Sequence, residues 1–220
     1  MHSLRITIVF CVLSLACLGN VFAQALDISS GGTPTITGAL GGSVSGASSV
    51  LTDLNVTVNF GEISPVNTNN IVKVVVPVAI RSNQPYKVQA AVIGATNANP
   101  QAVQRTDIGF GIRNFRAMGS NSRVCTNSSH IIYTPFNNDP ATSATIAANG
   151  RVTYPSTVNN ISTATTVLSG PRLSNGNNNR QTNDGYIFDA IFTITPQFFA
   201  AGVTSATITL TISAGPTVPC

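Results

Sequence analysis

The side chains that could carry out catalysis are few and far apart in the sequence. Apart from His2, the only histidine is His130, which follows the polar stretch 127–129. Acyl transfer needs a nucleophile, a base and an orienting acid that converge, and no serine has the G-x-S-x-G spacing of a nucleophile elbow. We therefore expect no catalytic site and interpret His130 as a surface loop residue.

The acidic residues are also isolated from one another. Glycoside hydrolysis needs two carboxylates that face each other across a cleft, yet Glu62 is the only glutamate and the aspartates are scattered. Most of these aspartates are expected in turns or at caps. Asp189 differs because apolar residues flank it in an extended stretch. It is either an outward-facing strand residue or a buried acid paired with an arginine.

The sequence contains no spacing typical of a metal site. Zinc sites need several Cys or His ligands close together, which His130 and the distant cysteines do not supply. The stretches Asn137-Asn138-Asp139 and Asn183-Asp184-Gly185 carry oxygen ligands suitable for calcium, but neither has the spaced acidic residues of a calcium loop. We interpret both as turns and expect no metal or other cofactor.

The first 25 residues have the layout of a signal peptide. Residues 1–5 carry a positive charge, residues 6–18 are apolar or small, and small residues precede both Gln24 and Leu26. Cleavage is expected after Ala23 or after Ala25. The apolar run is shorter than the ~20 residues of a spanning helix. We therefore expect export to the periplasm, cell surface or extracellular medium, without a transmembrane segment in the mature chain.

Two cysteines, Cys125 and Cys220, remain after this cleavage. An even pair in an exported chain is typical of a disulfide bond. In the chain-entropy model, closing a loop of roughly 100 residues stabilises a fold by ~4–5 kcal/mol. The alternatives are two free thiols, or a Cys220 that pairs with another chain.

The composition favours a β-rich protein without a nucleic-acid partner. Only 8% of the residues are charged, against ~25% in a usual domain, while 43% are hydrophobic. Exposed helix faces usually carry Glu, Lys and Arg, and disordered chains combine low hydrophobicity with high net charge. The net charge of +4 comes from scattered basic residues, without the dense basic patch of a nucleic-acid interface.

Alternation of apolar and polar residues predicts a series of short strands. Pro77 indicates that the strand at 71–80 is an edge strand or contains a bulge, and the short turn after it predicts a hairpin with the strand at 86–92. The clearest strands are expected at 54–60, 71–80, 86–92, 186–195 and 206–212, and weaker ones at 108–112, 131–133, 144–148, 152–154 and 165–168.

These strands predict a single β-sandwich domain over residues 53–220. Residues 26–52 are rich in Gly, Ser and Thr and are expected to form an N-terminal arm that could include a strand at 33–40. Tyr86, Tyr133, Tyr154 and Tyr186 lie in or beside strands, where we expect core packing and not an exposed platform for sugars.

Two stretches of the sequence carry a family resemblance. The run from Val58 to Pro65 (VNFGEISP) precedes an apolar strand and then Gln84-Pro85-Tyr86-Lys87-Val88, and Ala200-Ala201-Gly202 precedes the last strand. This order resembles bacterial spore-coat-U-type and other fimbrial subunit domains, although the early cysteine of that family is missing. The resemblance implies an immunoglobulin-like, Greek-key sandwich that is exported and assembled by strand addition into a surface fibre.

These features together predict a secreted, non-enzymatic protein with a structural or adhesive role at a cell surface. It would be a pilin-like subunit that assembles with copies of itself or with other surface subunits. An arm containing Ile36 and Leu40 would donate a strand, and the low charge leaves sheet edges unblunted. The alternative is a monomeric secreted sandwich that binds a glycan or a protein.

Overall fold

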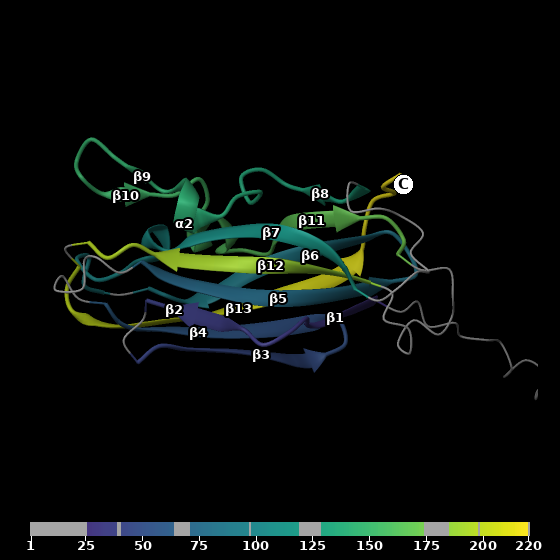
Figure 1. Ribbon diagram of the computed structural model, residues 1–220, viewed down its shortest axis with the longest axis horizontal. Coiled ribbons are helices and arrows are strands. Elements are labelled where there is room, and N and C mark those ends of the chain that lie inside the picture. Colours follow the sequence, from purple (N-terminus) through teal and green to yellow (C-terminus); the bar gives the residue numbers. More distant parts are fainter. Residues whose placement is uncertain are drawn as a thin grey trace, which may run out of the picture.

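The computed structural model describes residues 26–38, 41–63, 71–96, 98–118, 129–173, 185–197 and 199–219. These residues form two antiparallel sheets packed as a sandwich (Figure 1), which confirms the expected all-β fold. Sheet A contains, in order, β1 (Leu26–Ser30), β5 (Val72–Ser82), β12 (Gly185–Ile194) and β7 (Gly109–Met118), with β2 (Thr35–Thr37) also paired to β5. Sheet B contains, in order, β3 (Ser43–Val50), β4 (Asp53–Ile63), β13 (Gly202–Ala214), β6 (Tyr86–Gly94), β11 (Thr165–Gly170) and β8 (Ile131–Ile132).

The described residues outside the two sheets include a small hairpin and short helical turns. The hairpin pairs β9 (Thr145–Ile146) with β10 (Val152–Thr153). The turns are η2 (Arg105–Asp107), α2 (Pro140–Ser143) and η4 (Val158–Ile161). Both the hairpin and α2 belong to a long excursion between β8 and β11, which lies along one side of the sandwich (Figure 1).

The core lies between the sheets and is built from alternate residues of the long strands. In β4 the side chains of Leu54, Val56, Val58 and Phe60 are fully buried, while Thr57 between them is exposed. Successive side chains of a strand point to opposite faces, so this is the burial pattern that the sequence alternation predicts. Each fully buried side chain of this kind contributes roughly 1.5–3 kcal/mol through the hydrophobic effect.

The chain crosses from one sheet to the other at each step from β4 to β7. The hairpin predicted between 71–80 and 86–92 is therefore wrong, because β5 lies in sheet A and β6 lies in sheet B. β5 pairs with β1 and β12, and β6 pairs with β13 and β11. Alternation shows which face of each strand is buried, but it does not show which sheet the strand joins.

Pro77 lies in a central strand, contrary to the expected edge or bulge. β5 pairs with both β1 and β12 without a register shift. The carbonyl of Pro77 accepts a hydrogen bond from Gly31 N at 2.8 Å, and in a strand the nitrogen and carbonyl of one residue point to the same side. The proline nitrogen therefore faces the gap between β1 and β2, where neither strand places a carbonyl that would require an N–H donor at this position.

Residues expected to form an N-terminal arm contribute strands to both sheets. β1 pairs with β5 over its whole length, β2 pairs with the same strand, and β3 pairs with β4. Ile28 of β1 is fully buried in the core. The strand expected at 33–40 corresponds to β2. No strand is predicted at the positions of β1 and β3, because their many small residues give little alternation of apolar and polar side chains.

Candidate functional site

His130 is part of an aromatic cluster and not of a surface loop. Its ring lies 4.6 Å from that of Tyr186 and 4.8 Å from that of Phe115, measured between centroids, and 6.0 Å from that of Tyr86. Tyr86 belongs to sheet B, whereas Tyr186 and Phe115 belong to sheet A. The imidazole therefore packs where the two sheets meet, which corrects the interpretation made from its polar neighbours.

Asp189 is the buried acid that one of the two sequence interpretations describes. Only 7% of the residue is exposed, and its carboxylate accepts hydrogen bonds from Arg116 Nη1 at 2.9 Å and Asn114 Nδ2 at 2.9 Å. Asn114 has a positive φ of 56° near the register shift between β12 and β7, a conformation that asparagine tolerates well. These contacts satisfy the carboxylate, which makes it a structural residue.

The other ion-paired aspartates also have structural roles. Asp27 pairs with Arg81, Asp107 with Arg151, and Asp139 with Lys73. Asp139 Oδ1 also accepts from Ala141 N and so caps α2. Asn137-Asn138-Asp139 is therefore a turn and helix cap, and within the described ranges no group of three or more His, Cys, Asp or Glu side chains could hold a metal ion.

Several predicted features lie outside the described residues. These are the signal peptide at 1–25, the disulfide partners Cys125 and Cys220, and Asn183 and Asp184 of the second calcium candidate. The signal peptide, the disulfide bond and the turn at 183–185 therefore stay predictions. None of the helices within the described ranges is long and apolar enough to cross a membrane.

Two tyrosine hydroxyls are held in the protonated form by burial. Burial raises the pKa of Tyr86 well above its usual value, and the nearby Tyr186 adds to this rise. Burial also raises the pKa of Tyr154, against the opposing effect of its hydrogen bonds to Thr195. Neither hydroxyl is suited to act as a base near neutral pH.

The outer edge of β7 is covered by residues 133–161, which we call the cover segment. Phe110 N donates to Ser156 O at 3.0 Å, Ile112 N donates to Phe136 O at 2.8 Å, and Val158 N donates to Ile108 O at 2.9 Å. These bonds occupy main-chain groups that an edge strand would otherwise present to solvent. No further strand can pair along this stretch of sheet A without displacing them.

Glycines in β7 allow the cover segment to pack directly on the strand. A Cβ atom at Gly111 would lie 2.1 Å from the carbonyl oxygen of Asn138, and one at Gly109 would lie 2.6 Å from Pro140 Cβ. In the sequence, the alternation of these glycines with Ile108, Phe110 and Ile112 predicts only a strand. An alternating glycine in a strand also signals close backbone approach, which is its role here.

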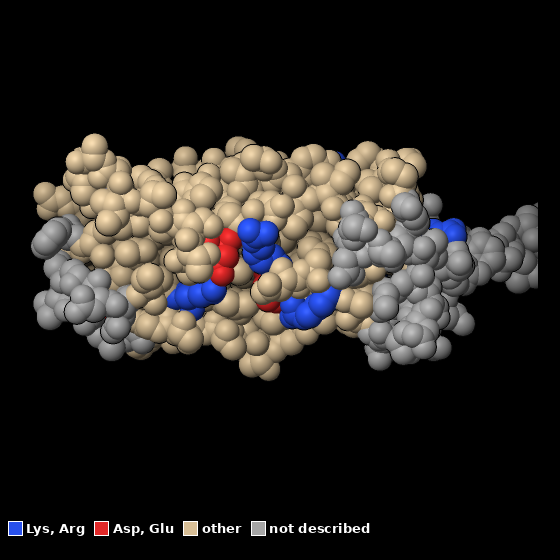
Figure 2. Space-filling model, turned by 45° about the horizontal axis from the view of Figure 1, so that its top comes forward, with Lys and Arg blue, Asp and Glu red and all other residues tan. Residues whose placement is uncertain are grey.

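Charged side chains strengthen the same contact. Figure 2 shows acidic and basic groups gathered near the middle of a largely uncharged face. Lys73 of β5 pairs with Asp139 of the cover segment at 2.7 Å, and Arg113 of β7 donates to Asn137 Oδ1 at 3.1 Å. Two of the charged side chains of sheet A thus attach the cover segment to it.

The edge of sheet B formed by β3 has a different character. β3 pairs with β4 through residues 43–50, and no other strand of the described chain pairs with it. Its sequence, SVSGASSV, contains no charged residue and no proline, and its register shifts only at one end, between Ser48 and Val50. Lysine, proline and bulges are the usual protection of exposed edges, and the described residues of β3 carry neither a charge nor a proline and have a register shift only near Val50.

Comparison with known proteins identifies no matching family model, no matching curated protein and no matching solved structure.

Proposed function

We propose that this protein is an exported, non-enzymatic surface subunit that assembles with copies of itself by strand addition at β3. The observation that carries this proposal is the bare β3 edge, which is eight residues long and lacks charge and proline. Main-chain groups of an unpaired edge form hydrogen bonds with any extended segment that reaches them. The signal-peptide layout and the resemblance to fimbrial subunits point in the same direction.

The partner is a second copy of this chain, because the edge itself supplies a matching strand. β3 against β3 in antiparallel orientation gives a two-fold dimer, whereas pairing of β3 with a different strand of the next copy is heterologous and propagates. The outer face beside β3 carries Asn55 and Thr57 and, on β13, Thr207 and Thr209. The acidic residues of β4, Asp53 and Glu62, lie near the two ends of that strand, so the middle of this face is uncharged.

The proposal is tested by placing a charge at the edge and the same charge one strand further in. Ser45 and Thr57 are opposite each other on β3 and β4, and both are exposed. Size-exclusion chromatography with light scattering on the exported, full mature chain measures assembly. We expect an oligomer for the unmodified protein, a monomer for Ser45→Lys, and an oligomer for Thr57→Lys.

Stability must be measured alongside assembly so that misfolding is not mistaken for a blocked edge. An exposed substitution of this kind changes the free energy of unfolding by no more than about 0.5 kcal/mol. The monomers of both variants should therefore unfold at nearly the same temperature as the monomer of the unmodified protein. A protein that is monomeric at every concentration contradicts the proposal, as does a Ser45→Lys variant that assembles normally. A Thr57→Lys variant that alone fails to assemble would assign the contact to the sheet face.

A further inference from the structure

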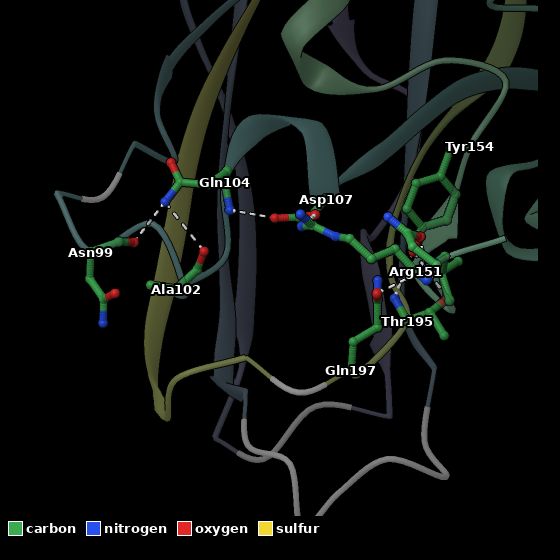
Figure 3. A network of polar contacts seen from close by, with 10 residues as sticks. Asn99, Ala102, Gln104, Asp107, Arg151, Tyr154, Thr195 and Gln197 are labelled. Atoms are coloured by element: carbon green, nitrogen blue, oxygen red, sulfur yellow. Dashed lines mark hydrogen bonds and ion pairs between the residues drawn. The ribbon is translucent and has the colours of Figure 1, made fainter. Parts of the chain in front are cut away.

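A pocket of about 650 Å³ opens at the end of the sandwich where three connections meet. Gln101 follows β6, Asn149 and Arg151 belong to the connection between β9 and β10, and Gln197 follows β12. Figure 3 shows Arg151 and Gln197 side by side in this region. The volume falls in the range of roughly 300–1,000 Å³ that is typical of small-ligand sites.

Hydrogen bonds between the connections fix the walls of this pocket. Val152 N donates to Gln197 Oε1 at 3.0 Å, which joins the β9–β10 hairpin to the end of β12. Ala200 N donates to the carbonyl of Gln101 at 2.9 Å, which joins the remaining connection. A site whose walls are held in this way loses little conformational entropy when it binds a ligand.

The side-chain oxygens of Asn149 and Gln197 both accept hydrogen bonds from the backbone, which leaves their amide nitrogens as the donors. Asn149 Oδ1 accepts from Arg151 N at 3.0 Å, so its amide nitrogen is the group that remains. Gln197 Oε1 is likewise occupied, and Gln197 Nε2 is buried with no acceptor among the described residues. Because a backbone N–H needs an oxygen, the orientation of both amides is fixed. Asn149 therefore offers an amide donor at the pocket, whereas Gln197 Nε2 is enclosed by the protein.

Arg151 is positioned by a buried carboxylate behind it. Its Nη2 lies 2.5 Å from Asp107 Oδ1, and the side chain of Asp107 is only 4% exposed. Gln104 N holds the other carboxylate oxygen at 2.9 Å. The side chain of Arg151 itself remains 53% exposed, so the other N–H groups of the planar guanidinium can reach a ligand. Such a group binds a carboxylate through two parallel hydrogen bonds.

We propose that this pocket binds a carboxylate-bearing saccharide. The carboxylate supplies acceptors for Arg151 and Asn149, and the rings of Pro100 and Pro196, which also line the pocket, provide apolar contact for the sugar ring. A neutral sugar would leave the guanidinium without a charged partner on the ligand side. The site lies apart from β3 in the chain and does not depend on assembly through that edge.

D-glucuronate and D-glucose are the matched probes for this proposal, because they differ in the carboxylate. Titration of the isotope-labelled protein, followed by the side-chain amide signals of asparagine and glutamine in NMR spectra, should show saturable shifts with glucuronate and none with glucose. Acetate is the third probe and should bind more weakly than glucuronate. Equal shifts with glucuronate and glucose would overturn the carboxylate preference, and equal affinity for acetate would overturn the saccharide.

Two substitutions locate the site. Asn149→Asp keeps the oxygen that accepts from Arg151 N and replaces the donor with a second acceptor, so we expect glucuronate affinity to fall about tenfold or more, since charged hydrogen bonds contribute roughly 1.5–3 kcal/mol. Arg105→Gln is the matched control, because Arg105 Nε donates to Gly94 O outside the pocket lining. Unchanged affinity in Asn149→Asp, or an equal loss in Arg105→Gln, contradicts the proposed site.

Discussion

The two edge strands β7 and β3 are similar in length but differ in how the chain treats them. β7 is ten residues long and lies beneath the cover segment, with main-chain hydrogen bonds along its outer edge. β3 is eight residues long, and β4 is the only strand hydrogen-bonded to it in the described structure. Covering β7 takes glycines at two strand positions and a long excursion of the chain. Among the described residues, no comparable segment covers β3, the edge to which the proposed function assigns assembly.

The largest expected effect comes from adding a side chain beneath the cover segment. In Gly111→Ala the new Cβ would lie 2.1 Å from the carbonyl oxygen of Asn138, so the backbone of the cover segment must move. We expect a loss of about 1–3 kcal/mol in the free energy of unfolding, as for other overpacked sites, measured by denaturant unfolding.

Hydrogen exchange shows whether the loss is local to the β7 edge. The Ile112 amide should exchange faster in Gly111→Ala, because its bond to Phe136 O opens with the cover segment. Gly32→Ala is the control, since its Cβ would be 3.6 Å from the nearest atoms. A stable Gly111→Ala protein with a protected Ile112 amide would mean that the cover is not held by close packing.

A smaller effect is expected from removing one polar contact under the cover. Ser156 is buried, donates to the carbonyl of Phe110, and accepts from Asn138 Nδ2 at 2.9 Å. Ser156→Ala should cost about 1–2 kcal/mol in thermal or denaturant unfolding, because buried groups lose a partner.

Ser45→Ala on β3 is the counterpart of this substitution. The side chain of Ser45 is exposed, so the free energy of unfolding should change by less than about 0.5 kcal/mol. Equal losses in Ser156→Ala and Ser45→Ala would remove the energetic difference between the two edges.

The smallest effect should be a gain at the bare edge. A Cβ at Gly46 would meet only Leu54 Cδ1 at 3.8 Å, an ordinary contact. Gly46→Ala should therefore stabilise β3 by about 0.5–1 kcal/mol, because glycine loses more conformational freedom on folding. The gain should appear in the unfolding of the monomer and as a shift toward larger species in light scattering. A destabilised Gly46→Ala variant would indicate that another part of the molecule already packs against β3 at this position.

The sequence predicts the strands of this protein better than their arrangement. Alternation in 54–60 locates β4 because burial of one face imposes a period of two, whereas the largely apolar stretch 186–195 locates β12, which is buried on both faces. Alternation does not assign β5 and β6 to opposite sheets, since either arrangement buries the same faces. β1 was missed because Ile28 is its main buried apolar residue and a single residue gives no period.

The candidate sites were harder to predict for a related reason. Gln101, Arg151 and Gln197 come from three connections far apart in the chain, and none carries a local motif. For Asp189 the sequence leaves two interpretations, of which the buried acid paired with an arginine is the one observed, because an acid between apolar strand residues needs a partner. The packing of His130 was not predicted, because its aromatic neighbours come from β6, β7 and β12.

The position of β13 has a consequence for how the polypeptide matures. β13 lies between β4 and β6 in sheet B, and its Thr207 meets Thr57 across a sequence separation of 150 residues. Until residues 202–214 have been synthesised, β4 and β6 lack the strand that joins them, and topologies dominated by such distant pairing fold slowly. A chain with this strand order can complete sheet B only after its last strand has left the ribosome, so a nascent chain that ends before residue 202 cannot form the native sheet.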